Sequence, residues 1–289
     1  MTLTISLIIP TYKREGSLGR VLKSLKSEER DLLEIIVVSQ GADTLKKLGG
    51  KVTILRLAKP SMTRARNFGA KKARGDLLLF LDDDVVVRKG LVGNHVRNFT
   101  DLTVAATCGR VITPDQKREP VDRHVGRIGV FGNVSGGFSS TIRQEVDTVI
   151  GCNMCWRRDV YTTLGGVDEQ FTGNALREET DLSLRAKKLG YNIIFEPKAV
   201  VEHHRAPTGG ARKSQGRLQW YYDFFSNETY FFLKHRPHIL LPFFWLTKSE
   251  WAMRCMFGFG REVSVRSFCM PFAGMADGVR KYRTFLHKL

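Results

Sequence analysis

Apolar runs alternate with helix-spaced segments along the first 110 residues of this chain. The apolar runs are rich in β-branched residues, and the segments between them carry apolar residues at helical intervals. The expected strands are residues 3–10, 33–39, 52–57, 77–81 and 104–110, and the expected helices are 16–27, 61–74 and 89–100. This alternation predicts an α/β fold with a doubly wound, mostly parallel sheet flanked by helices.

The strand expected at residues 77–81 is the most informative, because its five apolar residues end directly in Asp82, Asp83 and Asp84. Three carboxylates at the end of a buried strand repel one another and resist desolvation. A divalent cation would relieve both effects, because hard cations bind carboxylate oxygens. In an extended segment Asp82 and Asp84 point to the same side, so both are candidate ligands of Mg²⁺ or Mn²⁺. A solvated acidic turn is the alternative that so short a motif leaves open.

Other polar residues follow neighbouring strands of the predicted sheet. Pro10, Thr11 and Tyr12 come at the end of the first strand, and Gln40 follows the second. Ligands of open α/β sheets bind beyond the carboxyl ends of the strands, so these residues are expected to share one crevice with the acids. Tyr12 is either a stacking partner for a nucleobase or an ordinary packed aromatic.

The helix expected at 61–74 begins beside this crevice and is basic. Arg64 or Arg66 could bind a phosphate there, and the alternative is that both lie on a solvated helix face. The sequence contains neither a P-loop nor a glycine-rich dinucleotide fingerprint after a strand.

A second group of acids stands at the start of a later helix. Residues 123–143 are glycine-rich and predict short strands and loops, and a helix is expected to begin near Glu178 and end before Gly190. Glu178, Glu179 and Asp181 therefore lie at a helix N-terminus, where the helix dipole stabilises carboxylates. The functional alternative is that one of them is a general base for an acceptor hydroxyl.

Charge and cysteine content narrow the class of protein. The chain has 289 residues and a net charge of +17, which favours an anionic partner such as a nucleic acid, an acidic membrane surface or a phosphorylated ligand. Five cysteines without regular spacing argue against a disulfide framework and for a reducing, cytoplasmic location. Cys152 and Cys155 are expected to be buried structural thiols. No signal segment is visible, and no apolar run reaches the ~18 residues of a spanning helix.

The last part of the chain differs in composition. Residues 203–289 carry 14 Lys and Arg against 5 Asp and Glu, interleaved with aromatic clusters, and residues 275–289 look helical. Residues 208–217 are basic and glycine-rich, and they form either a lid over a phosphate-bearing ligand or a disordered surface loop. We expect a catalytic domain at 1–217 and a helical region at 218–289. That region either contacts a membrane peripherally, at its inner face, or packs against protein.

Taken together, the motifs along the chain resemble those of the family 2 glycosyltransferases, which are inverting enzymes of the GT-A fold. The resemblance covers roughly residues 3 to 235, and five short motifs carry it in order. They are Ile9-Pro10-Thr11-Tyr12; Leu81-Asp82-Asp83-Asp84; Gly151, Asn153 and Met154; Gly165-Gly166-Val167-Asp168-Glu169; and Glu178-Glu179 with Asp181, Leu182, Leu184 and Arg185.

The resemblance implies transfer of a sugar from a nucleotide-sugar donor to a glycan, polysaccharide or lipid-linked hydroxyl, with Mg²⁺ or Mn²⁺ on the diphosphate. Asp82 and Asp84 match the family's metal and donor positions, and Asp83 is counted with the donor site. Glu179 matches the catalytic base, and Glu178 is the fallback. His203 or His204 matches a late histidine that ligates the metal or faces the phosphates.

Two departures affect this interpretation. The family commonly carries an Asp pair after the second strand, whereas this chain has Ser39 and Gln40, so a UDP-sugar is only the default donor. The base position holds Glu179, which is one methylene longer than the usual Asp. A non-catalytic nucleotide-sugar-binding relative and a basic nucleic-acid-binding protein remain the rival interpretations. Nucleic acid is not expected, because the carboxylates at the strand end repel phosphates unless a metal intervenes.

Overall fold

The structure of the chain is a computed structural model that describes residues 3–41, 45, 49–114, 124–204, 210, 216–257 and 264–288. Its strands are β1 (Ile5–Thr11), β2 (Glu34–Gln40), β3 (Val52–Leu57), β4 (Leu77–Leu81), β5 (Val85–Val87), β6 (Val104–Ile112), β7 (Gln144–Glu145), β8 (Asn153–Arg157) and β9 (Asn192–His203). Its α-helices are α1 (Glu15–Ser24), α2 (Met62–Lys72), α3 (Leu91–Val96), α4 (Arg158–Thr163), α5 (Glu178–Lys188), α7 (Gly216–His235), α8 (Leu241–Leu246), α9 (Ser249–Phe257) and α10 (Val265–Leu286). Short 3₁₀ turns lie at Leu25–Ser27, Glu29–Asp31, Arg97–Thr100 and His238–Leu240.

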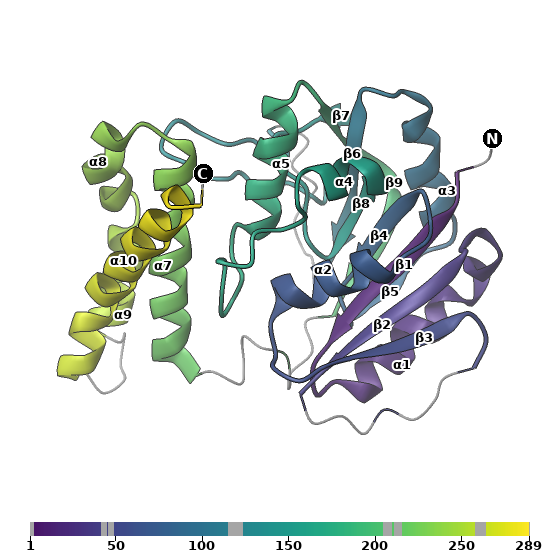
Figure 1. Ribbon diagram of the computed structural model, residues 1–289, viewed down its shortest axis with the longest axis horizontal. Coiled ribbons are helices and arrows are strands. Elements are labelled where there is room, and N and C mark those ends of the chain that lie inside the picture. The colour runs from purple at the N-terminus through teal and green to yellow at the C-terminus, as the bar shows by residue number, and fades with distance from the viewer. Residues whose placement is uncertain are drawn as a thin grey trace.

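The strands form one sheet in the order β3-β2-β1-β4-β8-β6-β9-β5, and β7 pairs with β9 (Figure 1). The pairs β3–β2, β2–β1, β1–β4 and β6–β9 are parallel, as the alternation of strands and helices predicts. β8 runs antiparallel between β4 and β6, which the sequence did not predict. Parallel neighbours need a crossover connection, and the chain from β6 to β8 has no helix among its described residues, so β8 returns in the opposite direction.

The central strands are buried on both faces. In β4 the side chains of Leu77, Leu79 and Leu81 pack on the face that α1 and α3 cover, whereas Leu78 and Phe80 pack on the face covered by α2, α4 and α5. This explains why β4 is apolar at every position, since each side of the sheet has its own layer of helices.

The three acids do not continue the strand as the sequence interpretation assumed. β4 ends at Leu81, Asp83 and Asp84 form a turn, and the chain resumes as the short strand β5. β5 pairs antiparallel with β9, and Val85 lies opposite His203. This pairing carries the end of β9 to the acidic turn.

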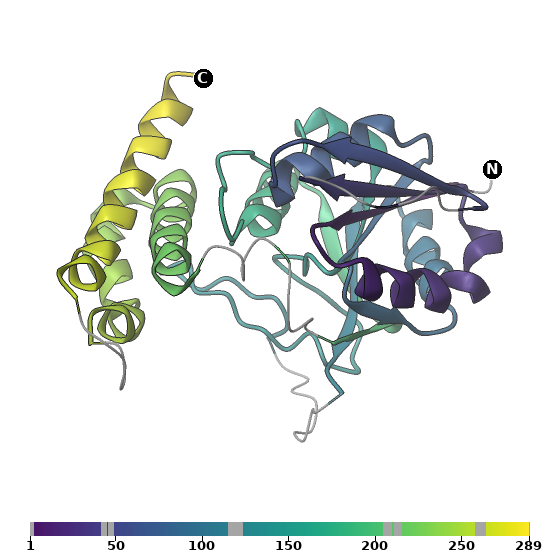
Figure 2. The ribbon, with the colours of Figure 1, turned by 90° about the horizontal axis from the view of Figure 1, so that it is seen from below.

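The C-terminal helices form a group beside the sheet (Figures 1 and 2). α10 packs on α7 through glycines: a Cβ at Gly274 would lie 2.6 Å from the carbonyl oxygen of Tyr222, and one at Gly278 would lie 2.6 Å from that of Ser226. α10 begins at Val265, ten residues before the helix expected from the sequence, because Ser264 caps it and Pro271 is tolerated inside it.

α7 begins at Gly216, beside the expected boundary at 217/218, and the division into two domains stays a prediction. Most of the proposed lid at 208–217 lies outside the described residues. None of the helices in the described part of the chain is both long and apolar enough to cross a bilayer.

Candidate metal and donor site

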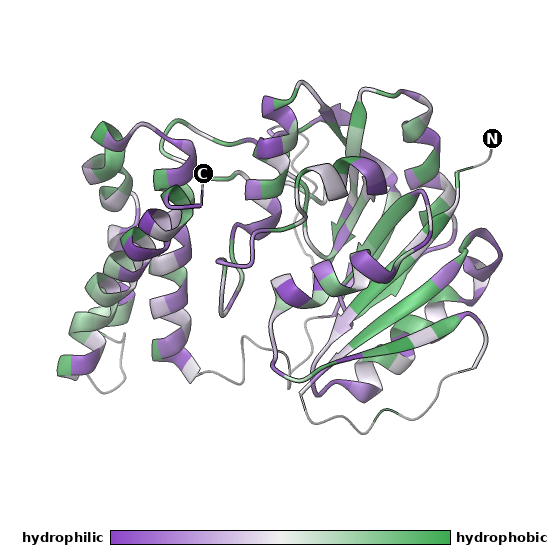
Figure 3. Cartoon of the chain, in the orientation of Figure 1, coloured by the Kyte–Doolittle hydropathy of each residue, from purple (hydrophilic) through white to green (hydrophobic). Residues whose placement is uncertain are grey.

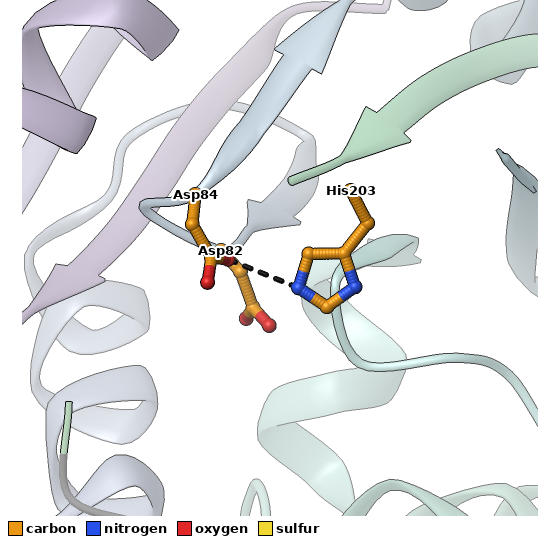
Figure 4. A group of neighbouring side chains, drawn as sticks. All are labelled: Asp82, Asp84 and His203. Carbon is orange, nitrogen blue, oxygen red and sulfur yellow. Dashed lines mark hydrogen bonds and ion pairs between the residues drawn. The ribbon is translucent and has the colours of Figure 1, made fainter. Parts of the chain in front are cut away.

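The acidic turn after β4 meets the end of β9 at the carboxyl edge of the sheet. Ligand atoms of Asp82, Asp84 and His203 all lie within 4.8 Å of one another (Figure 4). His203 Nε2 lies 3.0 Å from Asp84 Oδ1. Carboxylate oxygens together with one imidazole nitrogen suit Mn²⁺ and also admit Mg²⁺. The group therefore joins two of the predicted metal ligands from the turn with one of the two histidines.

His204 is placed differently from His203. Its backbone N–H donates to the carbonyl oxygen of Asp84, and its imidazole Nε2 lies 3.5 Å from Glu202 Oε2. Because neighbouring residues of a strand point to opposite faces, only one of the two histidines can face the acids directly. The structure brings His203 into the cluster and not His204.

Asp83 points away from the cluster and binds the loop after β1. Its carboxylate accepts hydrogen bonds from Thr11 Oγ1 at 2.7 Å and from Arg14 at 2.9 Å. Burial raises the pKa of Asp83 to about 6, although the Thr11 hydroxyl and the Arg14 charge favour its ionised form. Arg14 also donates to Asp84 at 3.0 Å, so one guanidinium ties two of the three acids to the end of β1.

Arg66 links the acidic turn to the start of α5. It is buried in α2, donates to the carbonyl oxygen of Gly151 at 2.8 Å, and lies 3.3 Å from Asp82 Oδ1. It also forms an ion pair with Glu178. Within the part of the chain that the structure describes, Arg66 Nε and Glu178 Oε2 are buried without a hydrogen-bond partner. Buried polar atoms are normally satisfied, so these two mark a place where water or a ligand is expected.

The two candidate bases at the start of α5 lie in different environments. Glu178 is almost wholly buried and its carboxylate faces Arg66, whereas Glu179 is only partly buried. Arginine stays protonated and stabilises the carboxylate that it pairs with. Glu178 is therefore engaged within the protein, and Glu179 is the more exposed of the two acids.

Asp181, the third acid of this helix start, belongs to a separate cluster. It is fully buried and binds Arg185 at 2.8 Å, Lys234 at 2.8 Å and His235 at 2.7 Å. Burial opposes its ionisation, but the hydrogen bond from His235 and the charges of Arg185 and Lys234 outweigh that effect and hold the pKa of Asp181 well below its usual range. Asp181 thus attaches α5 to α7.

The residues expected to face a nucleotide lie at the ends of β1 and β2. Tyr12 is partly exposed, and a Cβ at Gly41 would lie 2.9 Å from its ring, so the two strand ends adjoin. Pro10 is buried within β1. The carboxamide oxygen of Gln40 accepts from the backbone N–H of Ser61 at 2.7 Å and so anchors the start of α2.

The remaining side chains from the sequence analysis have local partners. Arg64 lies half exposed, 3.4 Å from Glu169, unlike the buried Arg66. Cys152 and Cys155 are buried free thiols, as predicted, and burial raises the pKa of both.

Sequence reasoning missed two positioning residues, Arg14 and Asn67. Asn67 accepts from the backbone N–H of Val167 at 3.0 Å and donates to its carbonyl at 2.9 Å, which fixes the Gly165-Gly166 turn on α2. Gly166 has φ +72°, and a Cβ there would lie 2.4 Å from Asn67 Oδ1. One feature of the sequence could have identified Arg14. It is a basic residue just after the first strand, at the edge of the sheet where Asp82, Asp83 and Asp84 are expected.

Curated proteins of similar sequence include glycosyltransferases. An O-antigen chain rhamnosyltransferase of Salmonella typhimurium, RfbN, is 26% identical over 216 residues, which are 69% of this chain and 66% of the relative. A pre-mycofactocin glycosyltransferase of Mycobacterium tuberculosis is 28% identical over 216 residues, which are 70% of this chain but 43% of that protein. The chain spans less than half the length of several curated relatives that it matches.

Solved structures show the same architecture. A crystal structure of GalNAc-T7 with UDP, GalNAc and Mn²⁺ has a TM-score of 0.62 at 17% identity, and the match covers 80% of this chain and 50% of that one. The expected GT-A fold, with its helical C-terminal region, is therefore confirmed. The model of glycosyl transferase family 2 matches residues 6–164, more than half of the sequence. From this match and from the order of its motifs, the chain belongs to glycosyl transferase family 2.

Proposed function

We propose that this chain is an inverting, metal-dependent glycosyltransferase that moves a sugar from a nucleotide-sugar donor to a hydroxyl acceptor. The observation that carries the proposal is the meeting of Asp82, Asp84 and His203 at the carboxyl edge of the sheet. Ligands of open α/β folds bind at that edge.

The donor set fits a resident divalent cation. Asp82, Asp84 and His203 would hold Mn²⁺ or Mg²⁺, and the bound ion would neutralise the charge of a nucleotide diphosphate as it departs. Two arginines hold these carboxylates in place. Arg14 forms ion pairs with Asp83 and Asp84, and Arg66 forms ion pairs with Asp82 and Glu178. In these pairs four carboxylates share two guanidinium groups, so the acids are held in place close to one another.

The nucleoside is proposed to lie beside Tyr12, over the ends of β1 and β2. At the end of β1, Thr11 orients Asp83 by a hydrogen bond. Gln40 is the last residue of β2, at the same edge of the sheet, where it could meet the base. Because its oxygen is engaged by Ser61, Gln40 can offer the base its amide NH₂ group, which suits a carbonyl oxygen such as that of a pyrimidine. A UDP-sugar is accordingly the first donor to test.

Glu179 is the proposed general base. A partly exposed carboxylate at the start of α5 can take the proton of the acceptor hydroxyl as that oxygen attacks the anomeric carbon. The carbon–oxygen bond to the diphosphate breaks on the opposite face, so the configuration of the sugar inverts. Glu178, held by Arg66, keeps the start of the helix next to Asp82.

The acceptor is proposed to be a growing glycan or a lipid-linked sugar. A relative that transfers rhamnose to an O-antigen chain supports a glycan. Five unpaired cysteines fit a reducing cytoplasm, and a lipid-linked acceptor would place the enzyme at the inner face of a membrane.

A thermal-shift panel tests the donor site. UDP-, GDP-, dTDP- and CMP-sugars are each added with and without Mn²⁺, because a ligand that binds only the folded chain raises its melting temperature. We expect a Mn²⁺-dependent rise with one nucleotide, followed by slow release of that nucleoside diphosphate. A rise without release in the presence of a range of hydroxyl acceptors would favour a non-catalytic binding protein, and no rise with any donor would contradict the proposal.

A further inference from the structure

The end of the helical region where α9 finishes and α10 begins carries large apolar side chains in solvent. Met253, Phe257, Val265, Phe268 and Phe272, here called the apolar end, are each about half exposed or more, and Val265 reaches 83%. Phe268 and Phe272 stand one turn apart with their ring centroids 6.3 Å from each other. Several large apolar side chains exposed on two consecutive helices are more than the single scattered ones that a soluble surface normally carries, and they indicate a contact site.

The core of the helical region does not need these side chains. The opposite face of α10, which includes Pro271, Gly274 and Gly278, packs against α7 at backbone distance. Cys255 of α9 is buried in the same core, whereas Met253 and Phe257 face outwards. The inner faces of both helices are therefore already packed, and the exposed apolar side chains on their outer faces are available for another contact.

Basic side chains accompany the apolar end. Arg254 and Arg266 are exposed on the same two helix segments, and Arg280 and Arg283 continue along the exposed side of α10, with Lys288 just after its end. Arg254 pairs with Glu250 and Arg280 with Asp277, whereas the other three add positive charge. The sequence from residue 203 onwards carries 14 Lys and Arg against 5 Asp and Glu. Apolar side chains bordered by arginine and lysine are the pattern of a helix that lies in the headgroup layer of an anionic bilayer.

We propose that the apolar end docks on an anionic lipid surface, with Phe257, Val265, Phe268 and Phe272 entering the headgroup–acyl boundary. The charge decides between this partner and a second copy of the chain, because two copies would bring their arginines together. A bilayer rich in phosphatidylglycerol or other acidic lipids supplies both the apolar layer and the opposite charge.

The direction of the apolar end suits the site. In Figure 1 the end of α9 and the start of α10 lie at the lower edge of the view, as does the carboxyl end of β1 where the candidate site is built. Figure 3 shows hydrophobic residues along this part of the helical region. Docking would thus turn the edge of the sheet that carries the candidate site towards the membrane. That consequence, unlike the docking itself, rests on the function proposed above.

Flotation of the full chain with lipid vesicles tests the docking without any donor or acceptor, so its result does not depend on catalysis. We expect flotation with vesicles that contain about one-third phosphatidylglycerol and little with pure phosphatidylcholine, and we expect it to weaken as salt is raised. Phe268→Ser together with Phe272→Ser should lower the bound fraction by at least about tenfold, since two phenyl groups lose their apolar contact.

Matched variants keep the test specific. Ile239→Ser with Leu246→Ser removes two exposed apolar side chains from the 3₁₀ turn before α8 and from α8 itself, and it should leave flotation unchanged. Arg254→Gln and Arg266→Gln should each weaken binding about fivefold. All these side chains are exposed, so unchanged melting temperatures confirm folding. Absence of flotation, equal loss in the Ile239/Leu246 variant, or a dimer that dissociates in the Phe268/Phe272 variant without flotation of the native chain would overturn the proposal.

Discussion

Two clusters of acidic residues, one at the α5–α7 junction and one at the edge of the sheet, differ in the cations that surround them. At the α5–α7 junction Asp181 is surrounded by Arg185, Lys234 and His235, and Lys234 and Tyr230 also bind Asp168. At the sheet edge Asp82 and Asp84 gather with His203, and the ion pairs there set four carboxylates against two arginines.

The difference separates a structural cluster from a ligand site. At the junction the chain supplies its own cations, so burial of the acid is tolerated and its pKa is lowered. At the edge Asp82 and Asp84 lie with His203 in a group that could hold a metal ion, and buried polar atoms of Arg66 and Glu178 lack hydrogen-bond partners among the described residues. Both clusters contain aspartate and histidine, so residue type alone does not distinguish them.

The largest effect is expected at the sheet edge. Asp84→Ala removes a carboxylate that contacts both His203 and Arg14, and we expect metal-dependent donor binding to fall by on the order of 1,000-fold. Isothermal titration with UDP-sugar and Mn²⁺ measures this. Asp31→Asn, at an exposed turn, is the control and should bind normally. Unchanged affinity in Asp84→Ala would remove the metal site from the account.

A substitution at the α5–α7 junction should lower the stability of the fold and leave donor binding unchanged. Asp181→Asn leaves Lys234 and Arg185 without their buried partner, and we expect the free energy of unfolding to fall by about 3–5 kcal/mol. Urea denaturation measures it. The folded fraction of this variant should bind donor and Mn²⁺ as the native chain does. A loss of metal binding with unchanged stability would reverse the roles assigned to the two clusters.

The two glutamates at the start of α5 sharpen the comparison. Glu179→Gln should keep donor binding but reduce kcat by ~100-fold or more, since the proton acceptor is lost. Glu178→Gln removes the partner of the buried Arg66 and should lower the melting temperature as well as activity. Glu179→Asp keeps a carboxylate at this position, with the shorter side chain that is usual in the family, so its kcat should lie between those of Glu179→Gln and the native chain. Full turnover in Glu179→Gln would move the base to another acid.

The smallest effect is in the pH dependence of stability. The folded-state pKa of Asp181 lies below its unfolded value, so its stabilisation is complete above that unfolded value, about pH 4, and is lost as the pH falls further. Denaturation between about pH 2 and 6 should therefore show a steeper fall for the native chain than for Asp181→Asn. Parallel curves would show that the junction contributes no such linkage.

Much of the fold could be predicted from the sequence. Buried strands such as β4 have a strong signature, because a strand covered on both faces is apolar at every position. The antiparallel β8 could not be predicted in the same way, since its direction depends on a long connection without helical periodicity. The early start of α10 was missed because a proline inside a helix normally argues for its end.

The sequence predicted which residues belong to the candidate site, but it did not predict which side chains they contact. The strand-end rule led to Asp82 and Asp84, and the family resemblance added the pair of late histidines, whereas only the β5–β9 pairing selects His203. The environments of Glu178 and Asp181 depend on Arg66 and on α7, which lie far away in the sequence. The local sequence around an acid therefore does not show whether a basic side chain from a distant part of the chain pairs with it.

Binding of Mn²⁺ itself is the most direct test of the central claim. Electron paramagnetic resonance counts free Mn²⁺ as the chain is added with and without UDP. We predict about one bound ion per chain, strengthened by UDP, lost in Asp84→Ala and retained in Asp181→Asn. Binding that survives Asp84→Ala, or that disappears in Asp181→Asn while the chain stays folded, would contradict the assignment of the sheet-edge cluster as the metal site.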